Sequence, residues 1–83
     1  MPDRPLENYV AEIQANGKQL RLCVTLTVEG DILAVVFDLE NNFNVYLSYE
    51  AESIEQAKEM ADARAREYLD GKDLRKVEWV KTI

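Results

Sequence analysis

Apolar and polar residues alternate along the first third of the chain, over residues 6–15 and again over residues 19–29. A period of two is typical of a strand that buries one face. Asn16-Gly17 lies between the two runs. This dipeptide is typical of a two-residue hairpin turn, because both of its residues tolerate a positive φ. The pattern therefore predicts a β-hairpin.

The two-residue turn also predicts the register of this hairpin. It pairs Ile13 with Leu20 and Glu12 with Arg21. The alternating apolar residues then share one face, and a pair of opposite charges lies on the other. Turn chemistry and hydrophobic pattern thus agree on the same hairpin.

A third strand is predicted over residues 32–40, after a two-residue turn at either Glu29-Gly30 or Gly30-Asp31. The first half of this strand is apolar on both faces, which is typical of a central strand. Either turn places the same four residues on the apolar face of the hairpin: Leu33, Val35, Phe37 and Leu39.

A fourth strand is predicted over residues 43–50. A three-residue loop at 40–42 needs a left-handed third residue, and asparagine tolerates that conformation best after glycine. We therefore expect a bulged turn with Asn42 left-handed. This loop places four more residues on the same face: Phe43, Val45, Leu47 and Tyr49.

A helix is predicted over residues 54–70. Ser53 and Gln56 have the spacing of a capping box, and Gly71 follows as a stop signal. A narrow apolar stripe, suited to close packing on one face of a sheet, runs along it: Ile54, Ala57, Ala61, Ala65, Tyr68 and Leu69.

A short C-terminal strand is predicted over residues 74–81, at an edge of its own sheet or of a partner's. The fold class is therefore α+β: a four-stranded antiparallel meander with one helix on one face and a short C-terminal strand. The length of 83 residues indicates a single domain, 1–83.

The net charge of −6, from 16 acids and 10 bases, argues against direct binding of nucleic acid or of an anionic membrane. No apolar run approaches the length of a membrane span, and the N-terminus has no apolar signal core. One cysteine cannot form an internal disulfide. We expect a cytoplasmic protein.

The chain lacks the residue patterns of common catalytic, metal and cofactor sites. It contains no histidine and only three glycines, each at a predicted turn or cap. Cys23 lies within a predicted strand, with no base nearby to activate it. We expect no catalytic, metal-binding or cofactor-binding residues and no enzymatic activity. A small carboxylate-using enzyme with an interfacial site is the alternative from another class.

Acidic residues concentrate in the middle of the chain, where residues 31–62 contain eight acids and one base, a net charge of −7. In the predicted meander, several acids gather at one end of the sheet with no base placed to neutralise them. They form a candidate docking patch for a protein with a basic surface: Glu29, Asp31, Glu50, Glu52, Glu55 and Glu59. The alternative is that they only favour the helix start and solubility.

The predicted sheet face opposite the helix is unusually apolar. We take it as a candidate interface, most simply of a homodimer packed sheet to sheet: Val10, Cys23, Ile32, Ala34, Val36 and Tyr46. The alternatives are that residues 72–83, with Trp79, fold over it, or that it is an apolar patch that a monomer tolerates.

Strands followed by a helix that begins Ser53-Ile54-Glu55-Gln56-Ala57 resemble small bacterial and phage families such as antitoxin-like domains and the arm-binding domains of integrases. The chain has neither the basic sheet of the latter nor the proline-glycine-cysteine segment of the former. We expect a non-catalytic, homodimeric protein-interaction module. The alternative within binding proteins is an acidic, DNA-mimicking inhibitor of a nucleic-acid-binding enzyme.

Overall fold

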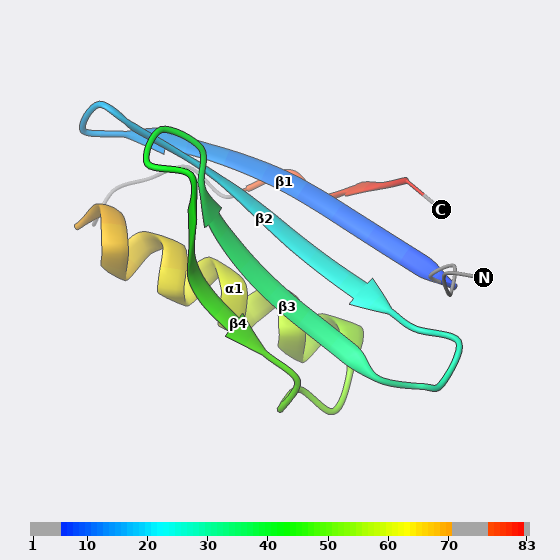
Figure 1. The fold of residues 1–83 in the computed structure, drawn as a ribbon. Helices are drawn as coiled ribbons and strands as arrows, with labels where there is room; N and C mark the ends of the chain where they lie inside the picture. Colours follow the sequence, from blue (N-terminus) through cyan, green and yellow to red (C-terminus); the bar gives the residue numbers. More distant parts are fainter. Residues whose placement is uncertain (1–5, 71–76, 83) are drawn as a thin grey trace.

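A computed structural model describes residues 6–70 and 77–82. It contains a five-stranded antiparallel sheet in the order β4-β3-β2-β1-β5, with the helix α1 across one face (Figure 1). The elements are β1 (Glu7–Ala15), β2 (Lys18–Leu26), β3 (Ile32–Asp38), β4 (Phe43–Ser48), α1 (Ile54–Leu69) and β5 (Val80–Lys81). The α+β fold class, the four-stranded meander and the single helix are confirmed.

The first hairpin has the predicted register along its whole length. Asn16 and Gly17 form its turn with φ values of 53° and 76°, as a two-residue turn of this kind requires. Glu12 lies opposite Arg21, and their side chains form an ion pair of 3.3 Å. Local turn chemistry therefore determines this part of the fold.

Helix α1 packs on the sheet through its alanine stripe. Ala57, Ala61 and Ala65 are fully buried, which allows the helix backbone to approach the strands closely. Ser53 caps the helix start by accepting a hydrogen bond of 3.0 Å from the backbone N–H of Gln56. Asp70 ends the helix in a left-handed conformation, and the predicted stop at Gly71 lies outside the described residues.

The turn between β2 and β3 differs from the prediction. The backbone N–H of Thr27 donates to the carbonyl of Asp31, so three residues, 28–30, form the loop instead of two. Gly30 has a φ of 92°, as the third residue of such a loop requires. One added loop residue exchanges the two faces of the next strand. The residues of β3 that were predicted to face α1 therefore lie on the other side of the sheet.

The turn between β3 and β4 contains four residues, 39–42, instead of three. Asn42 is left-handed with a φ of 58°, which confirms that part of the prediction. A bulge then shifts the register of β4 opposite Val36 and Phe37. Because the bulge restores the predicted register, Val35 pairs with Leu47 as expected.

Asp38, at the end of β3, is a buried charged residue of the core. Its carboxylate accepts hydrogen bonds from the backbone N–H groups of Glu40 (2.9 Å) and Asn41 (3.0 Å) and from the Asn41 side chain (2.9 Å). The Tyr68 hydroxyl of α1 donates another, of 2.7 Å. Donors from the turn and the helix thus compensate for the burial of this charge.

The C-terminal strand pairs within its own sheet. In β5, Val80 lies opposite Val10 and Lys81 lies opposite Tyr9, both on the outer edge of β1. Residues 74–76 of the predicted strand lie outside the described residues. The sequence predicted pairing at an edge of this sheet or of a partner's sheet, and β5 pairs with β1 of its own sheet.

Substitution of Asn42 tests the turn between β3 and β4. Asn42→Gly removes the steric cost of a left-handed backbone, so the free energy of unfolding should stay constant or rise by up to about 1 kcal/mol. Asn42→Val should lower it by about 1–2 kcal/mol, because a branched side chain is disfavoured at this φ. Urea unfolding measures both. A clear loss with glycine would show that the Asn42 side chain itself stabilises the turn.

Substitution of Asp38 tests the buried carboxylate. Hydrogen bonds from Asn41 and Tyr68 lower the pKa of Asp38 from 3.8 to about 2. Because the folded-state pKa is the lower one, this stabilisation is present above the unfolded pKa and is lost as the pH falls toward 2. Asp38→Asn should lower the melting temperature at pH 7 by about 10 °C and weaken its dependence on pH below 4.

Thermal unfolding followed by circular dichroism at pH 7 and at low pH measures both effects of Asp38→Asn. Glu40→Gln is the matched control, because Glu40 lies in the same turn with an exposed side chain. It should change neither the melting temperature nor its acid dependence. Equal acid dependence in Asp38→Asn and the unmodified protein would contradict the assignment.

Candidate functional site

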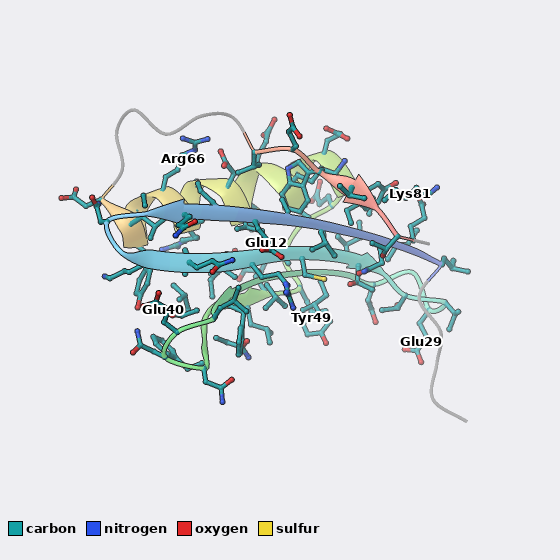
Figure 2. The ribbon with its side chains drawn as sticks, turned by 90° about the horizontal axis from the view of Figure 1, so that it is seen from above. Glu12, Glu29, Glu40, Tyr49, Arg66 and Lys81 are labelled. Atoms are coloured by element: carbon teal, nitrogen blue, oxygen red, sulfur yellow. The ribbon has the colours of Figure 1, made fainter. Side chains whose placement is uncertain are left out.

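The predicted acidic patch lies on three segments near one end of the sheet. Glu29 and Asp31 lie between β2 and β3, Glu50 and Glu52 lie between β4 and α1, and Glu55 and Glu59 lie on α1 (Figure 1). Figure 2 shows Glu29 at the far tip of its loop. Within residues 6–70 and 77–82, no group of three or more acids lies close enough to hold a metal ion. The acids form a dispersed rim.

One base does neutralise part of this rim, contrary to the prediction. Lys58 Nζ lies 3.6 Å from Glu55 Oε1 in the first turns of α1. The Lys58 ammonium also lies over the rings of Tyr9 (4.1 Å to the centroid) and Trp79 (5.9 Å). The helix therefore contacts β1 and the C-terminal segment through a cation–π cluster.

A cavity of about 240 Å³ adjoins this cluster between α1 and the C-terminal segment, lined by Glu55, Lys58, Glu59, Asp62, Val77 and Trp79. Two of its carboxylates are engaged with bases, since Glu55 pairs with Lys58 and Asp62 binds Arg66 at 2.9 Å. The walls of this cavity thus contain two ion-paired carboxylates, the further carboxylate of Glu59, and the aromatic surface of Trp79.

A second cavity of about 270 Å³ lies between β4 and α1, lined by Val45, Tyr46, Arg64, Glu67 and Tyr68. Arg64 lies over the Tyr46 ring, 5.2 Å from its centroid, and 3.9 Å from the Glu67 carboxylate. The Tyr68 hydroxyl donates a hydrogen bond to the Asp38 carboxylate, and this bond raises the pKa of Tyr68. This tyrosine is therefore poorly suited to act as a base.

Four of the six residues predicted for the open sheet face lie on the other face. Ala34 and Val36 are fully buried in the core, and Ile32 and Tyr46 pack against it. The three-residue loop at 28–30 is the physical reason, because it reverses the faces of β3 and, through pairing, of β4 beyond its bulge. The prediction was wrong for these four residues. It was correct for Val10 and Cys23, which lie on the open face, whereas their neighbours Tyr9 and Val24 lie on the face toward α1.

The open face is nevertheless apolar. Val80, Val10, Cys23, Val35 and Leu47 pair in sequence across all five strands. We call these five residues the central row. Within the described residues, no helix or strand covers this face, and Figure 2 shows Tyr49 on the side of the sheet away from α1.

Polar side chains flank the central row on both sides. On one side, Glu12 binds Arg21 (3.3 Å) and accepts a hydrogen bond from Gln19 (3.1 Å). On the other side, Asn8 Oδ1 accepts hydrogen bonds from Thr25 Oγ1 (2.7 Å) and Cys23 Sγ (3.3 Å). The face therefore has an apolar centre, with internally paired polar groups beside it on β1 and β2, an arrangement typical of protein interfaces.

Sequence reasoning missed the apolar residues that β3, β4 and the position just after β4 contribute to this face: Leu33, Val35, Phe37, Leu47 and Tyr49. The sequence does contain a signal that could have found them. Gly30 suits the left-handed third position of a three-residue loop as well as it suits a two-residue turn. Because β3 is apolar on both faces, its own pattern could not decide between the two loops.

No family model matches the chain, and no curated protein or solved structure matches it significantly. Within the part of the chain that the structure describes, no helix is long and apolar enough to cross a membrane.

Substitution of Lys58 tests the cation–π cluster. Lys58→Met keeps much of the apolar stem and removes the ammonium, so the free energy of unfolding should fall by about 0.5–1 kcal/mol. The emission of Trp79, the single tryptophan, should shift as its surroundings change. Arg64→Met, which removes the cation at the second cavity, should leave that emission unchanged. An unaltered emission spectrum in Lys58→Met would contradict the contact.

Proposed function

We propose that this protein is a non-catalytic protein-interaction module that binds through the open face of its sheet. The observation that supports this proposal is the central row with its apolar neighbours. Leu47, Tyr49 and Val80 are 52%, 60% and 60% exposed, although each is a large hydrophobic residue. Contiguous exposed apolar surface of this kind marks interaction sites in soluble domains.

The composition of β3 supports the same proposal. An antiparallel sheet with one solvated face normally alternates apolar with polar residues. Strand β3 instead has Ala34 and Val36 toward α1, and Leu33, Val35 and Phe37 toward the open face. A strand that is apolar on both faces suits a sheet that is covered on both faces, so the open face is suited to a partner.

The acidic rim has a secondary role in this proposal. Glu29, Asp31, Glu50 and Glu52 are all exposed, on two loops at one end of the sheet. A rim of one charge sign accelerates the encounter with an oppositely charged surface and orients it. We therefore propose the acidic rim as a second surface, separate from the open face and suited to a protein with a basic surface.

The charged groups of the two cavities support a non-catalytic role. Apart from Glu59, the charged residues that line the cavities are in ion pairs on the surface of α1: Glu55 with Lys58, Asp62 with Arg66, and Arg64 with Glu67. A catalytic acid or base needs a group free to exchange a proton with substrate. We also propose a cytoplasmic location, because Cys23 is a free and partly exposed thiol, which suits a reducing compartment.

Affinity capture from the native host, followed by mass spectrometry, tests the proposal. A partner that uses the open face should be captured by the unmodified protein and lost with Leu47→Glu. Because Leu47 is half exposed on an edge strand, this substitution should change the free energy of unfolding by no more than about 0.5 kcal/mol. Ala63→Glu, which adds the same charge at an exposed position of α1, is the control and should retain the partner.

Salt separates this proposal from the DNA-mimic alternative. Capture through an apolar face should persist at high salt, whereas capture by a rim of carboxylates should fall steeply. Loss of the partner at high salt, together with its retention by Leu47→Glu, would favour an inhibitor that presents carboxylates in place of DNA phosphates.

A further inference from the structure

We propose that the open face is occupied by a second copy of this chain, stacked face to face about a two-fold axis that runs along the central row. This inference rests on the proposed function and names the partner of the same surface. Face-to-face stacking would give each sheet the second covering layer that the single helix does not supply.

The distribution of charge favours contact between two copies through the open face over contact through the acidic surfaces of the protein. The chain has a net charge of −6, so two copies repel each other wherever their acidic surfaces meet. Within the described strands, the charged side chains of the open face are Glu12 and Arg21, which neutralise each other at 3.3 Å. Two copies can therefore meet here without juxtaposing net charge.

The same ion pair selects the direction of the two-fold axis. An axis along β2 would place Arg21 over its own copy, and two guanidinium groups would be buried together. An axis along the central row places Glu12 over the partner's Asn8 and Arg21 over the partner's Thr25. It also places Phe37 over the partner's Leu33, so polar groups meet polar groups and apolar groups meet apolar ones.

Cys23 marks the centre of this arrangement. It lies on β2, the middle strand of the sheet, and in the middle of the central row. An axis along the row places the two Cys23 side chains opposite each other. Stacked sheets lie about 10 Å apart, beyond the Cα separation of an ordinary disulfide, so a short bis-maleimide is the appropriate probe.

The area of the face is sufficient for a reversible dimer. The five strands contain 33 residues, and each covers about 4.8 Å by 3.4 Å of the sheet, which gives roughly 540 Å² per copy. The total for two copies, roughly 1,100 Å², lies near the lower limit for specific interfaces. We therefore expect exchange between monomer and dimer, so the measurement must span micromolar to millimolar protein.

Sedimentation equilibrium of the full chain over this concentration range tests the proposal. The unmodified protein should form a dimer. Leu47→Glu should lower the association constant at least about tenfold, because the substitution occurs twice in the interface. Ala63→Glu, at an exposed position of α1, should leave it unchanged, and circular dichroism should show all three proteins folded. A monomer at every concentration, or a dimer that Leu47→Glu leaves intact, would overturn the proposal.

Cross-linking tests the direction of the axis. The bis-maleimide should join two copies of the unmodified protein through Cys23. The double variant Arg21→Cys, Cys23→Ser places its thiol over the partner's Thr25, so it should not cross-link. An axis along β2 would place residue 21 as well as residue 23 over its own copy, so cross-linking of the double variant would contradict an axis along the central row.

The capture experiment separates failure of this inference from failure of the proposed function. If the protein is monomeric but Leu47→Glu loses a captured heterologous partner, the second copy is the wrong occupant and the open face remains a binding surface. If the protein is monomeric and Leu47→Glu captures the same proteins as the unmodified chain, both proposals fail.

Discussion

The buried carboxylate of Asp38 fixes the sheet and the helix relative to each other. It receives hydrogen bonds from the turn between β3 and β4 and from Tyr68 in the last turn of α1. Tyr68 in turn packs edge to face on Phe43 and lies under the ammonium of Lys18. Because the helix presents mainly alanine to the sheet, its contact surface has few bulky side chains to fix its position. A directional anchor at one end provides that constraint.

The sheet has an uncovered face because the described part of the chain contributes one helix to its two sides. One helix with a narrow stripe covers one side of a five-stranded sheet, and the described residues supply no second layer for the other (Figure 2). The Lys58 cluster holds the C-terminal segment beside α1, so this segment completes the helix side and adds β5 to the edge. The apolar surface that remains accessible is the central row and its neighbours, which is why the functional proposals concern that face.

Prediction succeeded where local chemistry determines the structure. The turn at Asn16-Gly17 and the alternation around it determine the first hairpin, and the Ser53 cap with the alanine stripe determines α1. Prediction failed at the faces of β3. Val35 and Val36 are equally apolar, so the choice between them depended on a single residue of loop length. The candidate interface was therefore expected in the right layer, with Val10 and Cys23, but with the wrong residues from β3 and β4.

The sequence by itself determined the elements, their order, the antiparallel meander and the left-handed Asn42, because turn residues and hydrophobic periods act over a few neighbouring positions. Only the tertiary structure decided which face of β3 is buried and where β5 pairs. A charged residue such as Asp38 is expected at the surface from its type alone. It is buried here because Tyr68, thirty positions further along the chain, and the amides of the turn supply the hydrogen bonds that its carboxylate needs. The loop at 28–30 turns this face of β3 toward α1, and contacts between distant parts of the chain stabilise it there.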